Sequence, residues 1–262
     1  SEKGLFRIDH SRRTIRQMTG LEMVQSGLPL NPVRGIASDH QDRIWIISSI
    51  GISLLQRNNS RFLFYPLPWK TGNGSENTIT AFAMDRDKEI WLGIRNRGLF
   101  RFDIETRTYR NYRDQDGKID QLNQSYLYHI LLDSDGVLWL SSISGLHCTH
   151  IKRRDWQTFL NRPESSHSIS QNDVRVAYED RNQNLWFGTF GGGLNKLNRS
   201  NLRFSTISAG SDYRFHLNNK MVWAICQDKQ SHLWIGTDTG LSHWNTTEKR
   251  FYYYKDDDLK NV

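Results

Sequence analysis

Long hydrophobic runs, cysteine and proline are all scarce in this chain of 262 residues. No run of 18 apolar residues occurs, so the sequence offers no candidate for a membrane-spanning helix. Two cysteines, Cys148 and Cys226, are too few for a disulfide framework or a multi-cysteine zinc motif. Unpaired cysteines are among the residues most often found in protein interiors, so we expect two free, buried thiols.

Clustered basic charge is also missing, although the net charge is +7 and the isoelectric point is near 9.4. Lys and Arg alternate with Asp and Glu, and the longest basic block is Lys152-Arg153-Arg154. A nucleic-acid interface needs a concentrated basic stripe. We therefore expect a mildly basic, solvated surface and no nucleic-acid partner.

The sequence instead contains a repeated motif that is organised around a tryptophan. These tryptophans recur at intervals of 46, 48, 47 and 48 residues and are Trp45, Trp91, Trp139, Trp186 and Trp234. An aspartate precedes each of them by six positions: Asp39, Asp85, Asp133, Asp180 and Asp228. A glycine follows each after six or seven positions: Gly51, Gly98, Gly145, Gly193 and Gly240. Repeats of 40 to 50 residues are typical of propellers, solenoids and arrays.

Each repeat reads as four short strands. In the first whole copy we expect strands at Val33–Ser38, Ile44–Ser48, Ile52–Gln56 and Arg61–Leu67, with a tight turn after Asp39. One such sheet cannot bury both of its faces alone, whereas sheets stacked face to face around an axis bury the tryptophans between them. The prediction is an all-β fold, a β-propeller of four-stranded antiparallel blades with all five tryptophans in the core.

The repeat boundaries divide the chain into about five and a half blades. The N-terminal segment aligns with the second half of a repeat, so we expect a half-blade at 1–18 and whole blades at about 31–67, 77–112, 125–160, 172–207 and 220–255. An open array would expose unpaired strand edges. We therefore expect 1–262 to be one sensor-domain fragment of a longer protein whose further repeats close a ring, most often of seven blades.

The motif is specific enough to suggest a family. Ile225–Leu241 and Ser168–Leu194 closely resemble the two-component regulator propeller repeat. The resemblance implies a periplasmic or extracellular sensor region on the outer side of a bacterial inner membrane. It further implies a small polar ligand, often an oligosaccharide, and a signal passed through a membrane helix to a histidine kinase or diguanylate cyclase. The membrane would be reached only through segments absent here, and a homodimer through the full-length receptor is left open.

Candidate ligand-binding residues lie where the repeats differ from one another. Inter-repeat loops and the corners between second and third strands are expected on one face of the scaffold, and loops on rigid scaffolds commonly carry function. The second residue of each first strand varies: Arg34, Thr80, Tyr128, Arg175 and Trp223. The corners add Arg95, Arg97, Phe190 and Asp238, and a long loop adds Trp69. Arginine forks and flat aromatic faces suit hydroxylated or anionic ligands, so of these we expect all except Thr80 to bind ligand.

Catalytic and metal sites have weaker support in the sequence. His147 and His150 would point to opposite faces of a strand, so no metal site is expected, and no cofactor motif occurs. The glycines at 191–193 precede a strand rather than a helix and so lack the geometry of a phosphate loop. Two alternatives to a non-enzymatic sensor stay open. One is a propeller lyase or hydrolase that uses His129 with Glu179, and the other is a protein-interaction scaffold.

Overall fold

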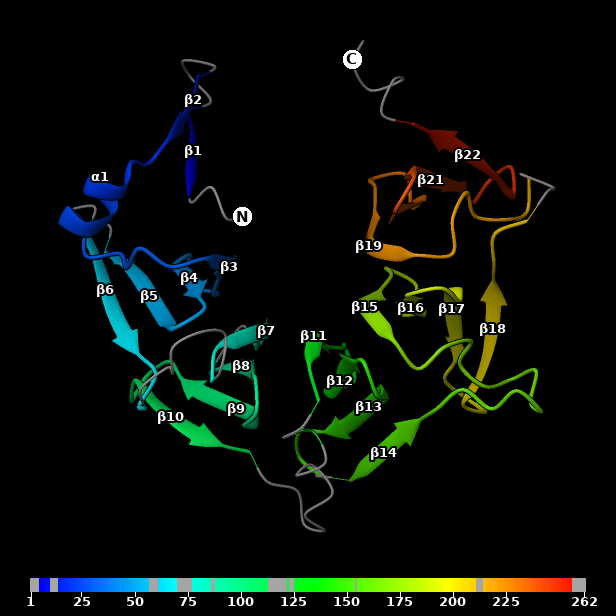
Figure 1. The fold of residues 1–262 in the computed structure, drawn as a ribbon, viewed down its shortest axis with the longest axis horizontal. Helices are drawn as coiled ribbons and strands as arrows, with labels where there is room; N and C mark the ends of the chain where they lie inside the picture. Colours follow the sequence, from blue (N-terminus) through cyan, green and yellow to red (C-terminus); the bar gives the residue numbers. More distant parts are fainter. Residues whose placement is uncertain are drawn as a thin grey trace. The chain divides into compact units, whose positions relative to one another are not determined.

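The computed structural model describes residues 5–9, 14–56, 61–69, 77–85, 88–112, 122, 125–153, 155–210 and 214–255. These residues form a two-stranded sheet, five four-stranded antiparallel sheets and one short helix (Figure 1). The helix, α1 (Gly20–Gln25), is far too short to cross a membrane, and the described residues contain no helix that could.

Strand bounds follow the repeat closely. The two-stranded sheet pairs β1 (Phe6–Asp9) with β2 (Thr14–Gln17). The first two four-stranded sheets comprise β3 (Val33–Ser38), β4 (Ile44–Ser48), β5 (Gly51–Gln56) and β6 (Arg61–Pro66), then β7 (Ile79–Met84), β8 (Glu89–Ile94), β9 (Gly98–Asp103) and β10 (Thr108–Asn111). The third comprises β11 (Leu127–Leu132), β12 (Val137–Ser142), β13 (Gly145–His150) and β14 (Trp156–Phe159). The last two comprise β15 (Val174–Glu179), β16 (Leu185–Thr189), β17 (Gly193–Asn198) and β18 (Arg203–Ile207), then β19 (Val222–Gln227), β20 (Leu233–Thr237), β21 (Gly240–Asn245) and β22 (Arg250–Tyr254).

The strand order within every four-stranded sheet is the order along the chain. Each strand therefore pairs with its sequence neighbours through short hairpins, which is the blade topology of a β-propeller. The four strands expected in the first whole repeat are confirmed to within one residue at each end. The prediction of an all-β propeller built from four-stranded antiparallel blades is also confirmed.

The described residues group into two compact units. The first contains α1 and β1 to β10, and the second contains β11 to β22. In the first unit β3 lies beside β7. In the second unit β11 lies beside β15, and β15 lies beside β19. Within each unit, the first strand of one sheet is therefore adjacent to the first strand of the next.

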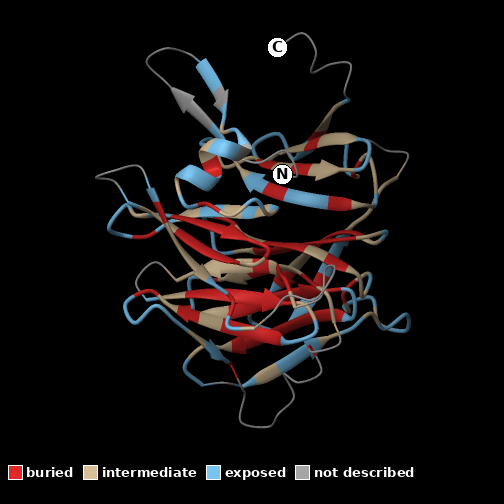
Figure 2. Ribbon diagram, turned by 60° about the vertical axis from the view of Figure 1, so that its left-hand side comes forward, coloured by how far each residue is buried: buried red, intermediate tan, exposed pale blue. Residues whose placement is uncertain are grey.

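The hydrophobic core lies between stacked sheets (Figure 2). In the first unit, Trp45 is fully buried among residues of the following sheet, including Phe102. In the second unit, Trp139 packs on Phe187, and Trp186 lies in the cluster that contains Val222. A large aromatic ring buries on the order of 150–250 Å², so each tryptophan is a major part of the contact between two sheets.

Glycine is needed at two positions of the repeat for two different physical reasons. Gly193 begins β17 at φ +80°, and a Cβ there would lie 2.4 Å from the carbonyl oxygen of Ile207. Gly188, two residues after Trp186, has an ordinary φ, but a Cβ there would lie 2.4 Å from a methyl carbon of Val222 in the next sheet. The first glycine permits the corner between strands, and the second permits close stacking of sheets.

The structure corrects three expectations. The loop from Thr19 to Pro32 contains α1, which begins with a capping box in which Thr19 and Glu22 bond each other's backbone. Trp234 is only partly buried, and Cys226 is exposed rather than buried. Both lie in the sheet β19–β22, whose contacts with other described sheets of its unit are made through β19 to β15 and β16. Trp234 stacks instead on His243 of its own sheet at 4.2 Å.

Candidate functional site

Every first strand carries a β-bulge at the same place. The pairing with the second strand skips one residue in all five sheets, and the skipped residues are Arg34, Thr80, Tyr128, Arg175 and Trp223. A bulge leaves its extra residue out of the ladder and re-aims that side chain. These are the five positions whose residue type varies between repeats. The backbone distortion is therefore constant while the side chain that it presents changes.

Loops and corners meet at this same end of each sheet. The backbone N–H of a corner residue donates to the carbonyl of the residue just before the first strand in all five sheets: Ser49 to Pro32, Arg95 to Thr78, Ile143 to Tyr126, Phe190 to Asp173 and Asp238 to Met221. The expectation that corners and inter-repeat loops share one edge is confirmed within each sheet. We call this end of each sheet, where the first strand begins and carries its bulge, the bulge edge.

Four of the predicted residues meet in the second unit, where three aromatic rings surround the guanidinium of Arg175. The Cζ atom of Arg175 lies 4.0 Å from the ring centroid of Tyr128, 4.7 Å from that of Phe190 and 5.2 Å from that of Trp223. Phe190 and Trp223 also meet edge to face at 5.7 Å. These residues come from three successive sheets, and they are adjacent because β11, β15 and β19 lie side by side. We call Tyr128, Arg175, Phe190 and Trp223 the Arg175 cluster.

An ion pair fixes the orientation of Arg175. Its Nη2 donates to Oδ2 of Asp173 at 2.7 Å, and its Nε lies 2.7 Å from Oδ1 of the same carboxylate. Both side chains are mostly buried, with exposed fractions of 18% and 20%. Burial raises the pKa of the Tyr128 hydroxyl, and the negative charge of Asp173 raises it further. The cluster thus joins a preoriented cation with a neutral phenol and two apolar rings, of which Trp223 is 45% exposed.

A smaller pair forms at the same edge in the first unit. Arg97 stacks over Trp69 at 4.5 Å, and its Nε donates to Oδ1 of Asn77 at 2.8 Å. Trp69 in turn packs on Phe100 at 5.0 Å. Two predicted residues, Arg97 and Trp69, are therefore in contact.

The remaining predicted residues are placed differently. Arg34 and Asp238 are both exposed. Arg95 is partly buried at the corner that its backbone ties to Thr78. The structure thus brings together six of the nine predicted residues, four in the second unit and two in the first.

The opposite end of each sheet carries the aspartate and the tryptophan of the repeat. One carboxylate oxygen of Asp180 accepts backbone N–H groups in its turn, and the other accepts Trp186 Nε1 at 2.9 Å. The same bond to the indole recurs at Asp39, Asp133 and Asp228. Trp91 Nε1 has no hydrogen-bond partner among the described residues. Burial alone would raise the pKa of Asp39, but hydrogen bonds from Trp45 and Arg43 outweigh it and hold that pKa below 3.8.

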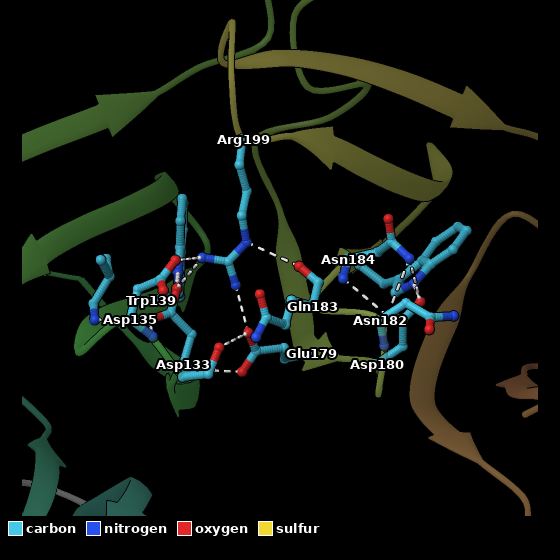
Figure 3. Close-up of polar contacts among 12 residues, drawn as sticks. Asp133, Asp135, Trp139, Glu179, Asp180, Asn182, Gln183, Asn184 and Arg199 are labelled. Carbon is cyan, nitrogen blue, oxygen red and sulfur yellow. Dashed lines mark hydrogen bonds and ion pairs between the residues drawn. The ribbon is translucent and has the colours of Figure 1, made fainter.

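Arg199 joins two sheets of the second unit at this aspartate edge (Figure 3). Its guanidinium contacts Asp133 at 3.1 Å and Asp135 at 2.5 Å in one sheet, and Glu179 at 2.5 Å in its own sheet. Glu179 also accepts the backbone N–H and the hydroxyl of Ser134 from the first of these sheets. These bonds use both oxygens of the Glu179 carboxylate, so the site has a structural role.

The residues of the enzymatic alternative do not form a pair. Glu179 is held by Arg199, and among the described residues no hydrogen bond or ion pair joins it to His129. Burial lowers the pKa of His129 to about 4, and its Nδ1 faces the backbone N–H of Ala177 at 3.5 Å. His147 lies between Ser142 and Thr158 at hydrogen-bond distance, and burial lowers its pKa to about 4 as well. Within the described ranges, no group of three metal-ligating side chains forms.

Sequence reasoning missed two members of the cluster's surroundings. Asp173 lies two residues before Arg175, and that spacing puts two side chains on the same side of an extended strand. Tyr126 packs on Tyr128 at 4.9 Å and has the same spacing from it. The alternation rule could therefore have found both residues once Arg175 and Tyr128 were chosen.

This architecture defines a class of protein: a β-propeller whose blades hold variable side chains on a constant bulge. Comparison with known families agrees with the repeat motif. Residues 168–191 and 216–239 match the family model for the two component regulator propeller. Two segments of the chain thus match the two-component regulator propeller repeat, as the sequence predicted.

Known proteins resemble longer stretches of the chain. A histidine kinase of Formosa agariphila is 23% identical over 195 residues, which span 73% of this chain and 14% of that protein. A B. thetaiotaomicron structure described as the extracellular domain of a hybrid two component system has a TM-score of 0.69 and 20% identity, over 90% of this chain and 31% of that one. PorZ, a surface component of the type-IX secretion system of Porphyromonas gingivalis, has a TM-score of 0.62 and 15% identity, over 88% of this chain and 34% of that one. The chain thus spans well under half the length of these relatives, and the likeness to the two solved structures concerns the fold.

Proposed function

We propose that this chain is a non-catalytic, ligand-sensing propeller segment of a bacterial transmembrane signalling receptor of the two-component type. The ligand is a small polar molecule, best represented by an oligosaccharide, and the segment lies on the periplasmic or extracellular side of the inner membrane. The output domain, a histidine kinase or a diguanylate cyclase, and any homodimer belong to the complete receptor. Support comes from the regulator propeller repeats and from the extracellular domains that share the fold.

The observation that carries this proposal is the Arg175 cluster. Three bulge residues from successive sheets contribute to it, so the variable positions of the second unit converge on one place. The ion pair with Asp173 holds the guanidinium fixed before any ligand arrives, which lowers the entropic cost of binding. Nη1 is outside that ion pair, so its N–H groups remain for a ligand oxygen.

The chemistry of the cluster favours a hydroxylated ring as ligand. The exposed face of Trp223 offers a flat apolar platform, on which the C–H face of a sugar can stack. The arginine donates to hydroxyl or carboxylate oxygens at the rim of such a ring. An exposed tryptophan beside an oriented cation is therefore more informative than either residue alone.

The test is a binding screen on the 262-residue chain. Xylo-, manno- and galacturono-oligosaccharides are titrated by calorimetry and followed by tryptophan fluorescence. For whichever sugar binds, Trp223→Ala and Arg175→Ala should each weaken affinity about tenfold or more, because each removes a stacking or charge-assisted contact of at least about 1.4 kcal/mol. Arg175→Lys should also weaken binding, since lysine lacks the planar fork.

Phe215→Ala is the matched control. Phe215 is 57% exposed in the loop before β19, so its removal changes exposed aromatic area at a position outside the cluster. Binding of a sugar with unchanged affinity in both Trp223→Ala and Arg175→Ala would place the site elsewhere. The absence of binding to every sugar in the screen would contradict an oligosaccharide ligand.

A further inference from the structure

A groove on the second unit is lined by residues of its outer strands and by none of the Arg175 cluster. It runs between β14 and β18, with the loop that joins their sheets along one side, and its volume is about 550 Å³. Ligand-binding cavities commonly measure roughly 300 to 1,000 Å³. Phe159 and Phe204 meet edge to face at 5.5 Å and form apolar lining. The groove is therefore large enough for an extended segment of chain.

The charged lining of the groove has one sign only. Its charged lining residues are Arg162 and Arg203, and no acidic side chain lines it. Both are exposed, and neither has an ion-pair partner among the described residues. The adjacent cavity of about 250 Å³ differs, because its Arg199 and Arg153 are paired with Asp135 and Asp155. Uncompensated positive charge in one groove and compensated charge in the next indicates an anionic occupant for the first.

The groove also meets the edge of a sheet. Its wall includes four consecutive residues, Gln157 to Leu160. Side chains alternate between the two faces of a strand, so one face of β14 would contribute only every second residue. Three consecutive residues of β14, with Leu160 directly after them, therefore bring the backbone edge of this strand to the groove. Among the described strands, β14 is the outermost of its sheet and pairs with β13 alone, and such an edge is a template for an added strand.

Leu202 is an unusual residue for its position. It precedes β18 at φ +54° and is 45% exposed on the groove wall. The residues at the same place before β10 and β22 are Arg107 and Lys249, which have similar positive φ values. An exposed leucine in a conformation that suits few side chains, where two other repeats have a cation, favours an apolar contact from outside.

The groove is already shaped without an occupant. The backbone N–H of Arg162 donates to the hydroxyl of Ser168, which donates back to the Arg162 carbonyl. The backbone N–H of Phe204 donates to the carbonyl of His167, which ties the loop to β18. A preformed wall reduces the ordering cost of binding.

We propose that this groove binds an extended acidic peptide segment of a partner protein, which adds a strand to β14. Acidic side chains of the segment pair with Arg162 and Arg203, and apolar side chains between them contact Leu202 and Leu160. The site is separate from the Arg175 cluster and requires no sugar.

Fluorescence anisotropy of a labelled short peptide with alternating Glu and Val tests this proposal. The peptide should bind the 262-residue chain more tightly at low salt than at high salt, and a Lys–Val peptide of equal length should not bind. The double variant Arg162→Glu, Arg203→Glu should weaken binding at least about fivefold, because two favourable ion pairs become repulsive. Leu202→Asn, which suits the positive φ at this position but removes the apolar contact, should weaken it as well.

Two further comparisons separate strand addition from simple charge attraction. Arg250→Glu, at the equivalent hairpin position of another sheet, should leave peptide affinity unchanged. Methylation of alternate backbone nitrogens of the peptide should abolish binding, because those N–H groups would pair with β14. Equal binding of the methylated peptide, or complete competition by inorganic sulfate at equal charge, would show an anion site without strand addition and overturn the proposal. Equal binding by the Arg162→Glu, Arg203→Glu variant would overturn it also.

Discussion

The two ends of the first strand in each sheet differ in which features recur from one repeat to the next. At the aspartate edge, residue type and contacts recur together, since Asp39, Asp133, Asp180 and Asp228 each bond the indole of their own repeat. At the bulge edge, the backbone recurs and the side chain does not. The first edge maintains the fold, and the second holds the residues that we propose for ligand binding. The comparison therefore separates structural residues from proposed functional residues within one chain.

The largest expected difference is between two tryptophans in adjacent sheets. Trp186→Ala removes a ring that is 7% exposed between two sheets and should cost about 3–5 kcal/mol of unfolding free energy. Trp223→Ala removes a ring that is 45% exposed at a bulge and should cost less than about 1 kcal/mol. Urea denaturation measures both. Equal costs would contradict the division between the two edges.

Arg199→Ala should have the next largest effect. It leaves Asp133, whose side chain has no exposed surface, and Glu179 without a cationic partner, so we expect a loss of about 1–3 kcal/mol. Arg153→Ala is the control, because its ion pair with Asp155 is more than half exposed on both sides and should be worth less than about 0.5 kcal/mol. Thermal denaturation at one salt concentration compares the two variants. A smaller loss for Arg199→Ala than for Arg153→Ala would show that the contacts of Arg199 at the aspartate edge do not stabilise the fold.

Acidification should weaken the sheet β11–β14. The pKa of His129 and that of His147 are lowered from 6.5 to about 4 by burial, so the unfolded chain binds their protons at a higher pH than the folded chain does. Their contribution to stability is complete above pH 6.5 and is lost as the pH falls toward 4, with a slope of at most about 1.4 kcal/mol per pH unit for each histidine. Unfolding free energies measured across this range for wild type, His129→Gln and His147→Gln should show a shallower slope in each variant. An unchanged slope in both variants would mean that burial does not lower the pKa of either histidine in the folded chain.

The smallest effect is expected at the exposed bulge of the first unit. Arg34→Ala should change the unfolding free energy by no more than about 0.5 kcal/mol, since its side chain lies outside the ladder and is exposed. Chemical denaturation checks this value. A loss above about 1 kcal/mol would show that the bulge residue supports the fold, contrary to the comparison of edges.

Much of the fold follows from the sequence because its determinants are local and repeat. The spacing of Asp39, Trp45 and Gly51 places a turn, a buried strand and a corner, and the strands lie there. The helix α1 occurs once, so no period points to it, although Thr19 and Glu22 form a recognisable cap. The exposure of Trp234 and Cys226 depends on what covers their sheet, and a repeat pattern carries no such information.

The candidate site could be predicted only in part. Variation between repeats identified Tyr128, Arg175 and Trp223, and their contact depends on three first strands lying side by side. No particular residue type marks the bulge that exposes them, so the bulge can be recognised only from the pairing register. The ion pair of Arg175 with Asp173 could have been predicted from the alternation of side chains along a strand. The groove beside β14 was not, because it depends on two outer strands and a loop whose relative position no local pattern specifies.

A bulged residue carries an evolutionary consequence. Because it has no partner across the strand, a mutation at Tyr128 or Trp223 breaks no rung of the ladder and shifts no neighbour's register. New side chains can therefore be tried at these points at almost no cost to stability. A lineage of the receptor that we propose could then change the molecule that it recognises one substitution at a time, while the framework beneath is inherited intact.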